Sequence, residues 1–219
     1  MATSLLDRLL GPRVAPDELR RHGFRYGLPS LLLLAARIMI LVSLFLPYWR
    51  MELHAPQYPN NLHLQAYVNH LTGDVAEIDG LNHYIGMRPL EEAARFERSA
   101  GVYLLILVAV LLEIAAAMHN RWAALLAAPA IFFPAVFLID LHLWLRHFGL
   151  NLDPDAPLSS AVDPFVPPVL GTGLIGQFKT VASAGPGLWL VAGSSVIIIA
   201  ALFFHRRARN PPVEGGASP

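Results

Sequence analysis

Four long apolar runs alternate with polar stretches along the chain. They cover residues 28–49, 100–118, 122–145 and 187–204. Each run approaches the roughly 20 apolar residues that a helix needs to cross the hydrocarbon core of a bilayer. Because backbone groups in lipid must form their hydrogen bonds within the segment, helices are the structure expected of these runs. The pattern predicts an all-α membrane protein, a bundle of four transmembrane helices.

The distribution of basic residues predicts how these helices are oriented. Arginines are dense in the N-terminal tail (1–27) and in the C-terminal tail (205–219), and sparse in two long polar loops, 50–99 and 146–186. Cytoplasmic segments carry the excess of basic residues, so both termini are predicted in the cytoplasm and both loops are predicted to be extracytoplasmic. The C-terminal tail is predicted to be disordered. An aromatic belt is expected at the outer interface, formed by Tyr48, Trp49, Trp144 and Trp189.

Composition narrows the possible chemistry. Hydrophobic residues make up 55% of the chain and charged residues 15%, and the formal net charge is zero. A zero net charge gives no electrostatic reason to expect a nucleic-acid partner, whereas membrane lipid is an expected one. The sequence has no cysteine, which excludes disulfides, thiolate metal sites and covalent c-type haem.

The first polar loop carries the side chains with the most evident ligand chemistry. Met51 precedes His54 by three residues, and Met87 follows His83 by four, a spacing that shares one face of a helix. Imidazole and thioether are ligands that copper accepts, and thioether favours Cu(I). Solvated histidines and packed methionines are the alternative interpretation of the same residues.

Two further candidate ligands lie near the outer end of the third run. Asp140 and His142 are expected at the same level as Met51 and His54, so the four could form one outer-face metal site together with His83 and Met87. An ion pair between Asp140 and Arg50 is the competing interpretation. The second polar loop is rich in proline, and its segment 166–178 is expected to cover such a site as a lid or re-entrant segment.

Ionisable residues inside the apolar runs are costly and indicate specific partners. Arg37 lies roughly 13 Å, and Glu113 roughly 8 Å, from the cytoplasmic ends of the first two runs at 1.5 Å per residue. An arginine side chain can bridge that difference in depth. The sequence therefore predicts an Arg37–Glu113 ion pair between the first two helices, with snorkelling of Glu113 to the interface as the alternative.

Four strings of residues resemble those of a known family. They are HAPQYP (54–59), LNHYIGM (81–87), GLNLDPDAPL (149–158) and PPVLGTGLIGQF (167–178). They resemble small bacterial inner-membrane proteins encoded beside nitrous-oxide reductase and copper-maturation genes, and the likeness extends over most of residues 30–200. The resemblance implies a periplasm-facing accessory protein in copper supply or cofactor assembly. The motif positions that it singles out are His54, Tyr58, Asn82, His83, Tyr84 and Met87.

We therefore expect a membrane-anchored accessory protein for copper handling or for assembly of a metalloenzyme of the nitrous-oxide reductase type, working with another membrane or periplasmic protein. A non-catalytic role is favoured, and an enzymatic one stays open. One alternative is a non-catalytic structural subunit or scaffold of a membrane enzyme complex. The other is an electron-transfer protein with non-covalent haem or quinone.

Overall fold

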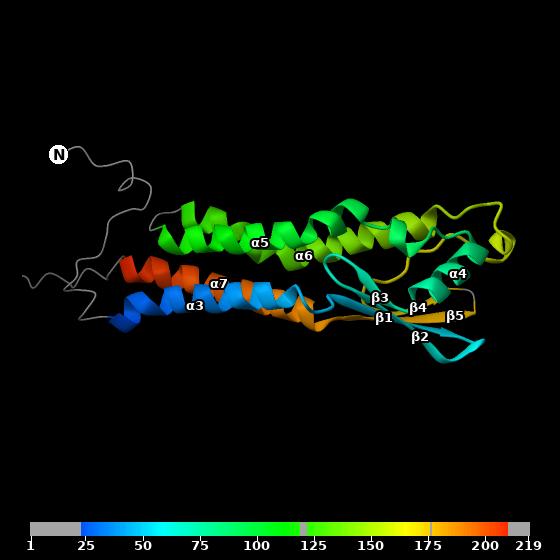
Figure 1. Cartoon of the computed structure of the whole chain (residues 1–219), viewed down its shortest axis with the longest axis horizontal. Helices are drawn as coiled ribbons and strands as arrows, with labels where there is room; N and C mark the ends of the chain where they lie inside the picture. Colours follow the sequence, from blue (N-terminus) through cyan, green and yellow to red (C-terminus); the bar gives the residue numbers. More distant parts are fainter. Residues whose placement is uncertain (1–22, 119–121, 176, 210–219) are drawn as a thin grey trace, which may run out of the picture. The chain divides into compact units, whose positions relative to one another are not determined.

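The computed structural model describes residues 23–118, 122–175 and 177–209 (Figure 1). The chain divides into two compact units. The described parts of residues 1–40, 107–132 and 192–219 form the first, here called the helical unit. Residues 41–106 and 133–191 form the second, here called the sheet unit. Because the sheet unit contains five antiparallel strands, the fold is mixed α/β and the prediction of an all-α protein is wrong.

Four apolar helices correspond to the four apolar runs. They are α3 (Gly23–Ser43), α5 (Arg95–Ala117), α6 (Trp122–Leu150) and α7 (Pro186–Arg209). Within the described part of the chain, three of them are long and apolar enough to cross a membrane: α5, α6 and the Pro186–Phe204 part of α7. The apolar part of α3, Gly27–Ser43, is shorter. The chain thus has the helices of a membrane protein, while a crossing by α3 and the location of the termini stay predictions.

The ends of these helices differ from the predicted bounds. Helix α3 stops at Ser43, six residues before the predicted end of the first span, and α6 continues to Leu150 without interruption at Pro129 or Pro134. Helix α7 includes residues 205–209, so the predicted disordered tail does not begin at 205. Residues 1–22 and 210–219, where the rest of the predicted tails fall, lie outside the described residues.

Alanine occupies many interior positions of the helical unit beside the buried Leu33, Ile40, Leu112 and Ile198, and large apolar side chains form much of its exterior. Buried positions are occupied by Ala36, Ala109, Ala115, Ala123, Ala127, Ala130 and Ala201. Exposed positions include Leu31, Ile38, Val110, Leu125, Phe132, Val196 and Ile199. In water this arrangement would forfeit hydrophobic stabilisation, whereas helices in lipid associate through small residues that let their backbones approach. The packing therefore agrees with a lipid environment.

Two polar contacts join helices within the helical unit. Arg37 of α3 forms an ion pair with Glu113 of α5, as the depth of the two residues predicted. The Ser195 hydroxyl of α7 donates a 3.2 Å hydrogen bond to the Ala130 carbonyl of α6. Both contacts satisfy groups that lipid cannot solvate.

The sheet unit is built on five antiparallel strands in the order β3-β2-β1-β5-β4. The strands are β1 (Trp49–Ala55), β2 (Tyr58–Ala66), β3 (Leu71–Gly73), β4 (Gly171–Ile175) and β5 (Phe178–Ala184). The central strand β1 pairs with its sequence neighbour β2 on one side and with the distant β5 on the other, where Trp49 lies opposite Ala184. Residues from both predicted loops therefore form one sheet.

Alternating side chains explain why these segments form strands. In β1, Trp49, Leu53 and Ala55 are buried, whereas Arg50 lies on the other face and is exposed. Successive side chains of a strand point to opposite faces, so a period of two separates an apolar face from a polar one. The apolar face packs into a core that also takes Ile78, Leu90 and Leu145. The polar face carries Arg50, Glu52, His54, His63, Gln65, Lys179 and Ser183.

Helix α4 (Val75–Ile85) lies against the sheet and ends in a close contact with the second polar segment (Figure 1). Gly86 caps α4 in the left-handed conformation, with φ +78°. Its carbonyl accepts a 2.8 Å hydrogen bond from Asp153, and the Tyr84 carbonyl accepts one of 2.9 Å from Leu158. We call this contact of residues 84–86 with residues 153–158 the clasp. After the clasp, a 3-10 turn (Leu90–Glu92) leads toward α5.

The structure of the sheet unit contradicts two further predictions, the aromatic belt and the lid over a metal site. Tyr48 and Trp49 are buried in it and do not form an interfacial belt, whereas Trp189 is 69% exposed. The segment 166–178 is neither a re-entrant helix nor a free lid, because it contains the edge strand β4 and the start of β5. Each of the four resembling strings lies in the sheet unit, where they form the β1–β2 hairpin, the two sides of the clasp and the β4–β5 hairpin.

Candidate binding cavity

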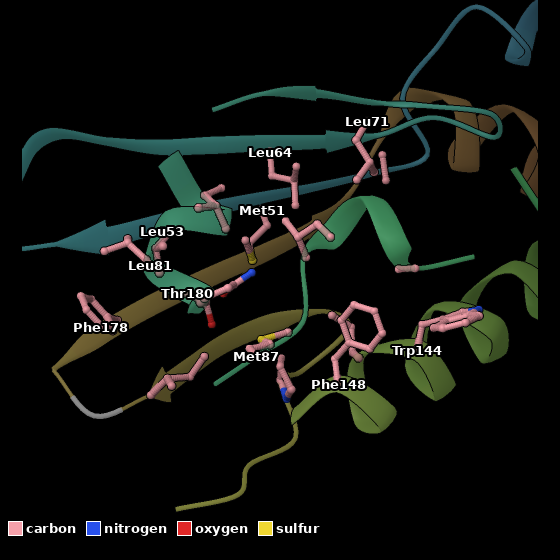
Figure 2. Close-up of a pocket in the computed structure, with 18 of the residues that line it drawn as sticks. Met51, Leu53, Leu64, Leu71, Leu81, Met87, Trp144, Phe148, Phe178 and Thr180 are labelled. Carbon is pink, nitrogen blue, oxygen red and sulfur yellow. The ribbon is translucent and has the colours of Figure 1, made fainter. Parts of the chain in front are cut away.

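A cavity of about 120 Å³ lies within the sheet unit, between the apolar face of the sheet, α4 and the C-terminal part of α6 (Figure 2). The strands supply Met51, Leu53 and Leu64, and α6 supplies Trp144 and Phe148. The wall is almost entirely apolar. It has the character of a binding site for small uncharged groups, which are typically held by apolar walls with a few polar contacts.

Aromatic side chains hold the cavity wall in place. The indole N–H of Trp49 donates a 2.5 Å hydrogen bond to the Val169 carbonyl, which ties β1 to the segment before β4. The rings of Trp144 and Phe148 meet edge to face, with centroids 5.7 Å apart. Such contacts fix large rings in one orientation, so the cavity is formed by packed side chains before any ligand enters.

Two thioethers face the same cavity. Met51 comes from β1, and Met87 comes from the segment after α4, just beyond the clasp. Figure 2 shows both side chains directed toward the space between the sheet and α6. Met87 is 9% exposed, so its sulfur is largely withdrawn from water. Both residues belong to the metal site predicted from the sequence.

Two buried polar side chains interrupt the apolar wall. Asn82 of α4 is 8% exposed and Thr180 of β5 is 4% exposed. The Asn82 amide lies 3.4 Å from the Asp79 carboxylate, and the Thr180 hydroxyl lies 3.4 Å from the Gly173 carbonyl. Both distances exceed the usual range for hydrogen bonds of these types.

Asp79 of α4 contacts both Asn82 and the segment that follows the clasp. Its carboxylate accepts a 2.7 Å hydrogen bond from the backbone N–H of Leu90. Burial raises the pKa of Asp79 above its usual value, and the hydrogen bonds from Leu90 and Asn82 oppose that rise only in part. Asp79 therefore fixes the 86–90 segment, including Met87, against α4.

The six predicted metal ligands do not gather at one point. Met51 and His54 lie on opposite faces of β1, because they are separated by three positions in a strand. On the polar face, the His54 imidazole lies 3.5 Å from the Glu52 carboxylate, which also accepts a 2.6 Å hydrogen bond from Asn61. The structure thus brings Met51 and Met87 to one cavity and separates His54 from them.

The remaining predicted ligands also lie elsewhere. His83 is exposed on α4, with its ring 6.2 Å from that of Tyr84. His142 is exposed on α6 beside a shallow hollow that includes Val169 and Leu170. Asp140 is half-buried on α6, and Glu97 of α5 is its charged neighbour. In the described part of the chain, no three histidine, aspartate or glutamate side chains are placed to hold a metal ion together.

The supporting motif residues have separate roles. Tyr58 packs against the core of the sheet unit, Tyr84 is 54% exposed and takes part in the clasp through its carbonyl, and Asn82 lines the cavity. Trp49, Trp144 and Thr180 were not identified from the sequence as site residues. The strict alternation of residues 49–55 was the signal that could have identified Trp49 as an inward-facing strand residue.

A scan of protein-family models finds no match to this chain, and a search of curated proteins finds none either. The chemistry of the cavity is therefore the basis for a functional proposal.

Proposed function

We propose that this protein is a membrane-anchored binding protein that takes up a small uncharged apolar ligand in the cavity of the sheet unit. The observation that carries the proposal is the apolar wall, to which no charged side chain contributes. A cavity of about 150 Å³ lined by aliphatic and aromatic side chains stays dry and binds benzene or xenon. The cavity of about 120 Å³ is suited to a ligand portion of similar size, such as one ring or the end of an alkyl chain.

The membrane setting completes this proposal. The apolar helices hold the sheet unit at the surface of a bacterial inner membrane, on the periplasmic side, with both termini in the cytoplasm. Lipid is the adjacent source of uncharged apolar molecules. The dense arginines of the two tails and the lipid-type packing of the helical unit support this arrangement.

Uptake of a fluorinated probe tests the proposal directly. The full chain in lipid nanodiscs would be titrated with fluorobenzene and followed by ¹⁹F NMR, with empty nanodiscs as the reference for partition into lipid. Ala66 lines the cavity, so Ala66→Leu should fill it and abolish the protein-dependent signal. Ala76→Leu, on the exposed side of α4, is the matched control and should bind as the wild type does. A signal that survives Ala66→Leu, or no signal with the wild type, would refute the proposal.

Monovalent copper is a second candidate ligand for the same cavity. The specific observation in its favour is that Met51 and Met87, which come from separate elements, line one space (Figure 2). Thioethers are soft neutral ligands that select Cu(I), and aromatic faces such as that of Trp144 attract cations. This candidate agrees with an accessory role in copper handling or metalloenzyme assembly, which the family resemblance implies.

Anaerobic titration with Cu(I) against a competing chelator separates the two candidates. Met51→Leu and Met87→Leu preserve the apolar volume but remove a sulfur, so each should abolish copper binding and leave fluorobenzene uptake intact. Met39→Leu, in the helical unit, is the matched control. Absence of stoichiometric copper on the wild type would reject the copper candidate. Absence of both ligands would favour the scaffold interpretation, to be pursued through co-purifying proteins.

A further inference from the structure

We propose that the ligand of the cavity bears one hydrogen-bonding oxygen, an alcohol or a carbonyl, which binds at Asn82 and Thr180. This inference rests on the proposed function, since it specifies which apolar molecules the cavity accepts. It predicts selection for amphiphiles with an apolar body and a single uncharged polar end, over hydrocarbons of the same size.

Both side chains are buried in the cavity wall. Asn82 and Thr180 come from α4 and β5, which are far apart in the sequence, and both line the same cavity. Each is more than nine-tenths buried. Figure 2 shows Thr180 among the side chains that surround the space. These two side chains are the polar groups that the otherwise apolar wall offers to a ligand.

The hydrogen bonds that these side chains make within the protein are weak. The Asn82 amide and the Thr180 hydroxyl each have a partner at 3.4 Å, whereas buried groups of these types normally reach about 2.7–3.2 Å. Buried polar groups in folded proteins are nearly always well hydrogen-bonded. A partner inside the cavity at a normal hydrogen-bond distance would therefore bind these two groups more strongly than their present long contacts do.

The chemistry of the two groups defines the partner. An amide has two N–H donors and a carbonyl acceptor, and a hydroxyl both donates and accepts, so together they suit an alcohol or a carbonyl oxygen. A carboxylate or ammonium group would enter an apolar wall with no opposite charge, which is strongly unfavourable. The polar end is therefore uncharged. Ordered water is the competing occupant, because a polar site with room for it can hold water.

A pair of matched probes tests this inference. The full chain in lipid nanodiscs would be titrated with 4-fluorophenol and with fluorobenzene by ¹⁹F NMR, each corrected for partition into empty nanodiscs. We expect the wild type to prefer the phenol by about three- to tenfold, the effect of one net hydrogen bond. Asn82→Leu and Thr180→Val should each reduce that preference while leaving fluorobenzene affinity within about threefold. Thr180→Ser keeps the hydroxyl and should restore the preference.

Thr172→Val is the matched control for Thr180→Val, because Thr172 lies exposed on the adjacent strand β4 and does not line the cavity. It should leave the preference unchanged. The inference is wrong if fluorobenzene binds but the phenol has no advantage, which is the result expected of a site that keeps its water. It is also wrong if the advantage survives both Asn82→Leu and Thr180→Val, because the phenol oxygen then binds elsewhere. If neither probe binds, the proposed function itself fails.

Discussion

Gly86 offers a sharp test of the clasp, because the backbone of Asp153 already occupies the space that a Cβ at residue 86 would need. A Cβ at residue 86 would lie 2.5 Å from the Asp153 carbonyl oxygen and 2.8 Å from the Asp153 nitrogen. Both obstacles are backbone atoms, which cannot turn aside as a side chain can. In addition, residue 86 has φ +78°, where a side chain is strained. Gly86→Ala must therefore either displace the 153–158 segment or distort the end of α4.

The expected loss follows from these contacts. The left-handed conformation costs alanine about 1 kcal/mol relative to glycine. Displacing 153–158 breaks the hydrogen bonds from Asp153 to Gly86 and from Leu158 to Tyr84, each worth about 1 kcal/mol. Gly86→Ala should therefore lower the free energy of unfolding of the sheet unit by about 3 kcal/mol.

Gly80→Ala is the matched control within the same helix. A Cβ at Gly80 meets nothing within 4 Å, so alanine should stabilise α4 by about 0.5–1 kcal/mol. The assay is urea unfolding of the full chain in nanodiscs, followed by tryptophan fluorescence, to which Trp49 and Trp144 of the cavity wall contribute. Opposite signs for the two variants are expected. Equal midpoints for Gly86→Ala and the wild type would refute the clasp as a stabilising contact.

Two further predictions concern charged groups. Folding raises the pKa of Asp79 above its usual value of 3.8. The stability that protonated Asp79 contributes is therefore complete at a pH below 3.8 and is lost as the pH rises through the pKa of the folded state. Asp79→Asn keeps an oxygen that can accept the hydrogen bond from the Leu90 N–H. The stability of this variant relative to the wild type should rise with pH across this window. A constant difference in unfolding midpoints from pH 3 to 6 would contradict this prediction. Arg37→Ala and Glu113→Ala should each lower stability in nanodiscs by up to about 3 kcal/mol, because each leaves a lone charge among apolar helices. The charge-reversed pair Arg37→Glu with Glu113→Arg should recover most of the loss, and failure to recover would mean that the pair does not act as a unit.

The sequence predicted the helices well because their signal is local. Runs of apolar residues mark α5, α6 and most of α7, and the depth of Arg37 and Glu113 predicted their ion pair. Each of these inferences needs only the distance along a helix. The lipid environment leaves few alternatives for such segments.

The sheet was missed because its signal is weaker and its pairing is non-local. Residues 49–55 alternate between apolar and polar side chains, as a half-buried strand does. Trp49 was instead assigned to a span, and the residues after it were interpreted by helical spacing. Helical spacing placed Met51 and His54 on one face, whereas in a strand they lie on opposite faces. Thr180 could not be placed at the cavity without knowing that β5 pairs with β1.

The pairing of β1 with β5 also constrains how the protein is made. Trp49 lies opposite Ala184, 135 residues later, and α5 and α6 come between them. Because β1 and β5 share one sheet, a membrane crossing by α5 and α6 requires that the two helices insert as a pair, with both polar segments on one side. At about 5–20 residues per second, the ribosome needs roughly 7–27 s to deliver β5 after β1. During that interval one edge of the central strand is open to wrong partners, and the sheet is complete only when both segments lie on the same side.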